Sequence, residues 1–415
     1  MTQSPDTGIG ARVRVARIAA GLTHAEMAGL VGRSERWAED VEAGRLPLDR
    51  YSLITAVATV CEVDVVWLLG QPYRLAREQG SAVPHVPALR AALRRSSLIL
   101  SGHPGLVPSA PAADVRRIRD QAAATNRHRQ GANLPAVAGL LPGLLEDLNT
   151  TTLLHERGTA EWDEALRLLV DAARNARQTL NQTGLPDLAW VAAEVAAGAA
   201  TQLDDPIVKA AVAWDRCGAL LHQGSARETQ AVADAALRDL EPLSATGDTD
   251  ALVLEGALVL RQVVASASAR AGDADAALDQ AARAVEVSDR LPAGHHDLRW
   301  QTVFSRANVL VHTTEAGVEV DAPDTGLSFV DNVDVTAMPS RERITHYRID
   351  EARAMHRMGR SADAVVTLRA AAQRAPHYVH AHPMARELVG DMVRRGVPLQ
   401  AAALSGLVRG MELVS

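Results

Sequence analysis

Aromatic residues are scarce in this chain: they make up 3% of its 415 residues, and Lys209 is its single lysine. Strands of β-sheets draw on aromatic and β-branched residues, whereas closely packed helices use small residues such as the alanine that is abundant here. The shortage of aromatics therefore favours an all-α protein over a β-sandwich or a β-barrel.

Cysteine and long apolar runs are also lacking. Cys61 and Cys217 fit neither a disulfide framework nor a zinc site, and both lie in apolar helical patterns, so we expect buried free thiols. No run of about 18 apolar residues is present, so no membrane contact is expected. Residues 1–10 are polar and lack the apolar core of a secretory signal, and the expected location is the cytoplasm. The net charge of −7 means that any contact with DNA must be local.

Five short helices are predicted within residues 9–70. Thr23 followed by Glu26 forms a capping box, Ser34 starts the next helix, and Asp49 is placed to cap the fourth. Only a short turn separates the second helix from the third, which is the pattern of a helix-turn-helix domain. Glycines end the first three helices at Gly21, Gly32 and Gly44.

Residues 9–70 resemble the phage-repressor-like (XRE) class of helix-turn-helix domains. The stretch LTHAEMAGLVGRSERWAEDVEAG, at residues 22–44, matches its pattern without a gap over the two central helices. The resemblance implies a double-stranded DNA operator as partner and a recognition helix at residues 34–43, with an internal ion pair between Arg17 and Glu42. The DNA-binding residues that it implies are His24, Arg33, Ser34, Glu35, Arg36, Trp37, Asp40 and Arg50.

Each of these positions has an expected role. Glu35, Arg36 and Asp40 face base edges, where Arg36 holds guanine and Glu35 accepts from a cytosine amino group. His24 and Arg50 occupy positions that contact phosphate. The third helix is nevertheless acidic, with Glu39 and Glu42 beside Glu35 and Asp40, and it therefore opposes the attraction to phosphate. The alternative is a degenerate domain in a protein-interaction adaptor.

The rest of the chain divides into two predicted parts. The helix-turn-helix domain spans residues 1–72, and a Pro- and Gly-rich linker with a docking helix (ALRAALRRSSLIL) spans residues 73–114. Residues 115–415 resemble tetratricopeptide repeats, which form an α-solenoid with a concave face. Two segments share the same offsets from a turn glycine: Gly272 with Ala277, Ala281 and Ala284, and Gly359 with Ala364, Leu368 and Ala371.

The whole chain is similar in architecture to peptide-sensing quorum regulators, which combine these two domains. The resemblance implies a homodimer that senses a peptide or a small-molecule effector. Trp300, Phe304, Asn308 and His312 are spaced four apart, so we expect them on one helical face, with Asn308 contacting the effector. The alternative is that the aromatic residues belong to the core. Weaker candidates for the groove are Trp190, Trp214 and Arg261.

No catalytic motif, metal site or cofactor site is predicted. The sequence contains no P-loop, no nucleophile elbow and no H-E-x-x-H pattern, so we do not expect an enzyme. His295, His296 and Asp297 lack further ligands at zinc-like spacing, and we interpret them as a loop in which Asp297 caps a helix.

Overall fold

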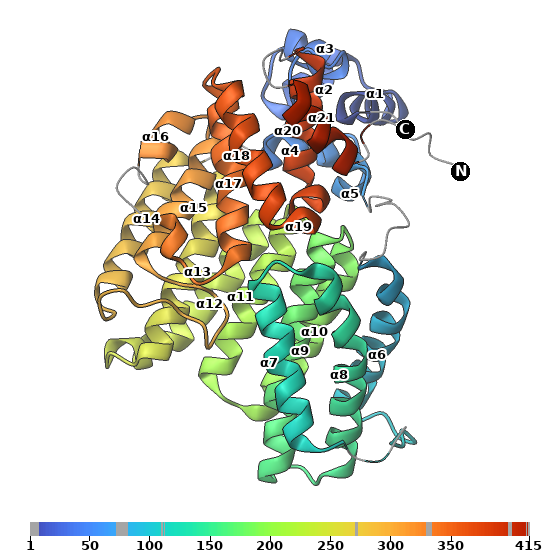
Figure 1. Cartoon of the computed structure of the whole chain (residues 1–415), viewed down its shortest axis with the longest axis vertical. Helices are drawn as coiled ribbons and strands as arrows, with labels where there is room; N and C mark the ends of the chain where they lie inside the picture. The colour runs from blue at the N-terminus through green and yellow to red at the C-terminus, as the bar shows by residue number, and fades with distance from the viewer. Residues whose placement is uncertain are drawn as a thin grey trace.

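The computed structural model describes residues 8–71, 82–108, 111, 113–269, 273–328, 334–396, 401–411 and 413. Every regular element within these ranges is helical, so the all-α prediction is confirmed (Figure 1). Among the described helices, none combines the length and the apolar character that crossing a lipid bilayer requires.

Five short helices form the N-terminal domain at one end of the molecule (Figure 1). Thr23 and Glu26 form the predicted capping box, and the Ser34 hydroxyl accepts a hydrogen bond from the Trp37 amide at 3.3 Å. Gly32 has a φ of 78°, a left-handed conformation that glycine adopts without strain. The helices are α1 (Ile9–Ala19), α2 (His24–Val31), α3 (Glu35–Glu42), α4 (Tyr51–Val60) and α5 (Val65–Leu69).

The prediction that Asp49 caps the fourth helix is wrong. Helix α4 has Arg50 at its N-cap, and no side chain caps it. Asp49 is buried, and its carboxylate instead accepts a hydrogen bond from the Arg357 guanidinium at 3.3 Å. The Asp49 side chain, which the local pattern assigned to the cap of α4, is therefore engaged in a tertiary contact with a distant helix.

The remaining helices form a stack in which consecutive helices pack on one another, as in an α-solenoid (Figure 1). Its first part comprises the 3₁₀ helix η1 (Val83–His85), α6 (Val86–Leu100), α7 (Val115–Gln130), α8 (Leu134–Leu154), α9 (Ala160–Gln182), α10 (Pro186–Leu203), α11 (Pro206–His222), α12 (Ala226–Ala245), α13 (Thr249–Ala267) and α14 (Ala274–Asp289). Its second part comprises α15 (Arg306–Glu319), α16 (Pro323–Ser328), η2 (Val335–Ala337), α17 (Arg341–Arg357), α18 (Ser361–Arg374), α19 (Pro376–Ala381), α20 (Pro383–Arg394) and α21 (Ala401–Gly410).

Small residues allow these helices to approach one another closely. The alanines expected at the tight positions of α14 and α18, together with Leu368, are all buried. Gly359 lies in the turn before α18 with a φ of 79°, whereas Gly272 lies outside the described residues. Cys61 and Cys217 are buried free thiols, as expected.

One hydrophobic cluster joins the N-terminal domain to the last helices of the chain. It includes Val13 and Ile54 from the first domain and Leu368, Val389 and Leu404 from helices α18, α20 and α21. Figure 1 shows α20 and α21 beside α1–α5, although they come from opposite ends of the sequence. The N-terminal domain is therefore docked on the stack by apolar contact.

Candidate DNA-binding surface and central cavity

Two of the expected base-reading residues, Glu35 and Arg36, lie at the exposed start of α3. The Arg36 side chain is 89% exposed, and its guanidinium lies 3.7 Å from the Asp40 carboxylate one turn later. Arg33, Ser34 and Glu35 are also exposed at this end of the helix. The start of the helix thus presents the Arg36 guanidinium and the Glu35 carboxylate to solvent, with the guanidinium loosely paired to Asp40.

Trp37 and Asp40 point partly inward. Trp37 packs against the hydrophobic cluster of the domain, and Asp40 accepts a hydrogen bond from the Arg45 guanidinium at 2.6 Å. Each of these side chains therefore has a structural partner within the domain itself.

The predicted internal ion pair between Arg17 and Glu42 is confirmed, at 2.5 Å. His24 joins it, because its Nε2 lies 3.0 Å from the same carboxylate. Burial alone would raise the pKa of Glu42, but hydrogen bonds from Arg17 and His24 outweigh it and hold the pKa below its ordinary value. Glu42 thus stays ionised and ties α1, α2 and α3 together.

The prediction that Arg50 lies on the DNA-facing surface is wrong. Arg50 is 7% exposed and points toward the helical stack, with Nη1 3.5 Å from the Glu319 carbonyl oxygen and 3.8 Å from the Asp321 carboxylate. A guanidinium enclosed between two domains cannot reach a phosphate. The sequence pattern missed this placement because the docking of the domains is a long-range contact.

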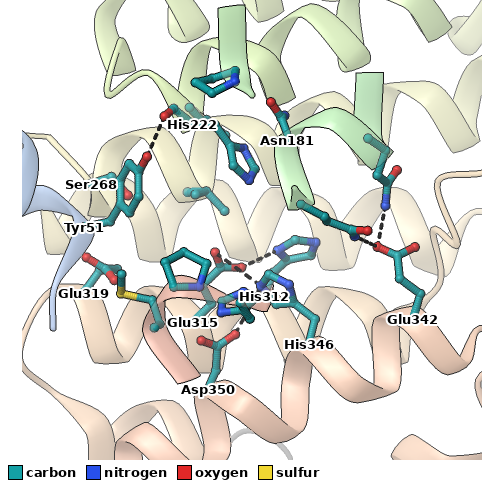
Figure 2. Close-up of a pocket in the computed structure, with 18 of the residues that line it drawn as sticks. Tyr51, Asn181, His222, Ser268, His312, Glu315, Glu319, Glu342, His346 and Asp350 are labelled. Atoms are coloured by element: carbon teal, nitrogen blue, oxygen red, sulfur yellow. Dashed lines mark hydrogen bonds and ion pairs between the residues drawn. The ribbon is translucent and has the colours of Figure 1, made fainter. Parts of the chain in front are cut away.

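A cavity lies where the N-terminal domain meets the stack (Figure 2). The centre of a water molecule can occupy about 170 Å³ of it, against about 10–15 Å³ for a single bound water. Tyr51, Leu69 and Gln71 line it from the N-terminal domain, and helices α9, α11, α13, α15, α17, α19 and α20 supply most of the other walls. The Tyr51 hydroxyl donates a hydrogen bond to the His222 carbonyl oxygen at 2.5 Å.

Arg177 and Arg261 line one side of the cavity, and Arg174 lies behind them. Arg174 and Arg177 both bind the buried carboxylate of Asp215. Arg261 stacks on Trp214, with its guanidinium carbon 4.1 Å from the ring centroid. Burial and the charge of Arg177 lower the pKa of Arg261 to about 10. Two guanidinium groups therefore share one carboxylate, and the third stacks on the tryptophan that precedes Asp215 in the sequence.

Two of the cavity arginines have no ionic partner in the part of the chain that the structure describes. Among the described residues, no carboxylate lies within 4.0 Å of the guanidinium of Arg261 or of Arg343. Within the same part of the chain, Arg261 Nε and Arg343 Nη1 are buried without a hydrogen-bond acceptor. A buried cation without a partner is costly, so the cavity is suited to a negatively charged group.

The opposite side of the cavity gathers histidine and carboxylate side chains from α15 and α17 (Figure 2). His312 Nδ1 lies 3.2 Å from Glu315 Oε2, and His346 Nε2 lies 3.9 Å from Glu315 Oε1 and 3.5 Å from Asp350 Oδ2. Burial, together with the nearby charge of Arg343, lowers the pKa of His312 to about 4, so this imidazole is neutral at pH 7.

The four expected effector residues do not share one helical face. Helix α15 begins at Arg306, and the chain from 295 to 305 is irregular because the Asp297 carboxylate accepts hydrogen bonds from the amides of Trp300 and Thr302. Asp297 therefore orders a loop and does not cap a helix. Of the four, only His312 lines the cavity.

The other three lie elsewhere. Phe304 is fully buried against Gly256, Trp300 packs between two hydrophobic clusters, and Asn308 is 1% exposed, with its amide 3.5 Å from the Thr302 carbonyl oxygen. Two of the weaker candidates, Trp214 and Arg261, do line the cavity.

Sequence reasoning found His312 but missed Glu315, His346 and Asp350 of the same cavity wall. His346 and Asp350 are four residues apart on a helical pattern, which is a signal for a shared face. Glu315 lies on another helix, and no local pattern brings it to them.

Comparison with known proteins supports the assignment of the first domain. Residues 9–66 match a family model described as a helix-turn-helix domain. No curated protein matches the chain. The matched region runs from the start of α1 into α5 and contains the capped α2–turn–α3 unit. Residues 9–66 are thus a helix-turn-helix domain, of the kind through which transcriptional regulators bind DNA, and the chain continues into a helical stack.

Proposed function

We propose that this chain is a sequence-specific DNA-binding transcriptional regulator of the XRE type, whose helical stack, built from tetratricopeptide-like repeats, senses an effector in the central cavity. The observation that carries the proposal is the composition of the cavity wall. Side chains of the helix-turn-helix domain and of the stack line the same space. A ligand bound there contacts both domains at once.

The DNA contacts of the proposal centre on the exposed start of α3. The 89% exposed Arg36 side chain would leave its long contact with Asp40 and donate two hydrogen bonds to guanine, and Glu35 would accept one from cytosine. Arg33 supplies charge for a phosphate. Arg50 takes no part, because it is buried against the stack.

The effector of the proposal carries a negative charge. Arg261 and Arg343 present buried N–H groups without acceptors, and a carboxylate or a similar anion satisfies them. The volume of the cavity suits a small molecule, or the C-terminal carboxylate of a peptide, rather than a whole folded ligand.

Coupling between effector and DNA follows from the contacts of α4. Ser52 donates its backbone N–H to Glu319 at 3.3 Å, and Arg353 donates to the Asp49 carbonyl oxygen at 2.5 Å. An effector that binds the docked and undocked arrangements unequally shifts the population between them. The orientation of α3 relative to the stack then changes with effector concentration.

The proposal includes a homodimer. One helix-turn-helix domain reads too few base pairs to be specific in a genome, and two-fold symmetry is the commonest way to double the site. The two recognition helices are expected to lie about 34 Å apart, or a multiple of this, to meet successive major grooves. Light scattering at micromolar concentration tests the dimer directly, and a chain that binds DNA as a monomer contradicts this part.

The experiment that tests DNA binding is selection of genomic fragments by the purified chain, followed by fluorescence anisotropy on the fragment bound most tightly. Arg36→Ala should weaken specific binding by about 1–3 kcal/mol, as loss of a bidentate guanine contact does. The matched control is Arg216→Ala, which removes a partly exposed arginine from α11 that pairs with Glu194. Equal affinity of the Arg36→Ala variant and the parent contradicts the proposal.

A second candidate is a protein-interaction adaptor with a degenerate helix-turn-helix domain. It is favoured by Glu35 and Glu39, which are exposed on α3 and repel phosphate. Salt separates the two functions, because an operator binder shows a specific complex that weakens steeply with ionic strength. If no genomic fragment is enriched, the adaptor is the better explanation.

A further inference from the structure

We propose that Glu315, His346 and Asp350 bind a divalent first-row transition-metal ion of the Zn²⁺, Mn²⁺ or Fe²⁺ class. Each residue offers one ligand atom, and these atoms all lie within 4.8 Å of one another. The inference goes beyond the proposed function, because binding of a metal does not depend on binding of DNA.

The distances fit a shared ion better than they fit hydrogen bonds. Imidazole Nε2 of His346 lies 3.5 Å from Asp350 Oδ2 and 3.9 Å from Glu315 Oε1, both longer than the usual N–H···O range. Four tetrahedral bonds of about 2.1 Å place neighbouring ligand atoms about 3.4 Å apart. The His346–Asp350 separation is close to this value, whereas the three ligand atoms as a set lie within 4.8 Å, so the Glu315 side chain would move inward on binding.

One ligand atom is buried without a partner. Asp350 is 2% exposed, and its Oδ2, which faces His346 Nε2, has no hydrogen-bond donor in the described part of the chain. A buried carboxylate oxygen is usually satisfied. A metal ion between these two atoms supplies the missing partner.

Each ligand is also held by an outer partner, as the ligands of protein metal sites are. His346 Nδ1 lies 3.0 Å from the Tyr378 hydroxyl, and the other oxygen of Asp350 accepts from Arg353 at 2.8 Å. The second oxygen of Glu315 lies 3.2 Å from His312 Nδ1. These contacts leave Nε2 of His346 and one oxygen of each carboxylate directed at the proposed metal position.

The donor set selects the metal class. Calcium and magnesium prefer all-oxygen sites, whereas imidazole suits zinc, iron and their neighbours. Two carboxylates and one neutral imidazole carry a charge of −2, which balances a divalent ion. Three protein ligands leave a coordination position open to the cavity, where water completes the shell.

The test is equilibrium binding to the full chain after it has been stripped with a chelator. We expect one equivalent of Zn²⁺ by calorimetry, with weaker binding of Mn²⁺ and no comparable binding of Mg²⁺ or Ca²⁺. Glu315→Gln and Asp350→Asn, which keep the side-chain shape, should abolish stoichiometric binding. Tyr378→Phe should weaken binding about 10- to 100-fold, as loss of an outer partner does.

The control is the double variant His295→Ala/His296→Ala, which removes a histidine pair from the segment between α14 and α15 and should bind as the parent does. The proposal is overturned if the parent binds no metal, if both ligand variants still bind one equivalent of metal, or if the control variant no longer binds it. Should the ligand variants not fold, Co²⁺ added to the parent chain gives a separate readout. Absence of d–d absorption from an imidazole- and carboxylate-bound ion then overturns the proposal.

Discussion

Removal of the Glu319 carboxylate should undock the helix-turn-helix domain. Glu319 is 5% exposed, accepts from Arg353 at 2.8 Å, and accepts the Ser52 amide at the start of α4. Breaking a buried ion pair costs about 3–5 kcal/mol. In the variant, Arg353 retains its other ion pair, with Asp350 at 2.8 Å, so the lower end of this energy range applies. Glu319→Ala should therefore cost about 3 kcal/mol of docking free energy.

The assay is hydrogen–deuterium exchange followed by mass spectrometry. A cost of about 3 kcal/mol corresponds to roughly 100-fold more frequent opening, so the amides of α4 should exchange that much faster, while those of the distant helix α8 should be unchanged. The control Glu194→Ala breaks a partly exposed ion pair with Arg216, which is worth about 0–1 kcal/mol. Unchanged exchange in α4 refutes the reasoning, as does equal acceleration in α8, because that result reports global unfolding.

Three further predictions concern the folded chain. A Cβ added at Gly256 meets Phe304 Cζ at 1.9 Å, so Gly256→Ala should lower the free energy of unfolding by about 1–3 kcal/mol in a urea titration. Gly143→Ala is the control, because it meets no atom within 4 Å and should not destabilise the chain. Burial raises the pKa of Glu387 from 4.5 to about 7 in the folded chain. The unfolded chain therefore loses this proton at a lower pH than the folded chain does. The free energy of unfolding should fall by up to about 3 kcal/mol as pH rises from 4.5 through 7. Glu387→Gln should abolish that part of the dependence, and an unchanged pH profile would contradict it. Burial also raises the pKa of Cys217 to about 12, so this thiol should react with Ellman's reagent at pH 8 only in urea; rapid labelling of the native chain would show that the packing is wrong.

Local chemistry made the first domain predictable from its sequence. The Thr23–Glu26 capping box, the Ser34 cap and the turn glycines each act within a few residues, and the structure has all of them. The ion pair between Arg17 and Glu42 was also predictable, because the resemblance to a known class of domain fixes which helices meet.

The cavity was not predictable, because its residues come together only through tertiary packing. A spacing of four residues indicates a shared face only if the segment is helical, and the hydrogen bonds of Asp297 keep residues 295–305 out of a helix. Gln301 and Val303 in this segment have positive φ angles, which are outside the range of a right-handed helix. Arg50 was misplaced for a related reason, since its partners Glu319 and Asp321 follow more than two hundred residues later.

The hydrophobic cluster that joins the two ends of the chain has a consequence for synthesis. Helices α1–α5 leave the ribosome first, but the cluster to which they contribute is completed by α18–α21, which begin at Ser361. At about 5–20 residues per second, the 292 residues from Gly70 through Ser361 take about 15–60 s to make. Throughout that interval the apolar flank of the nascent helix-turn-helix domain faces solvent or a chaperone. The docked arrangement of the helix-turn-helix domain can therefore form only after α18–α21 have been made, not when the domain itself emerges.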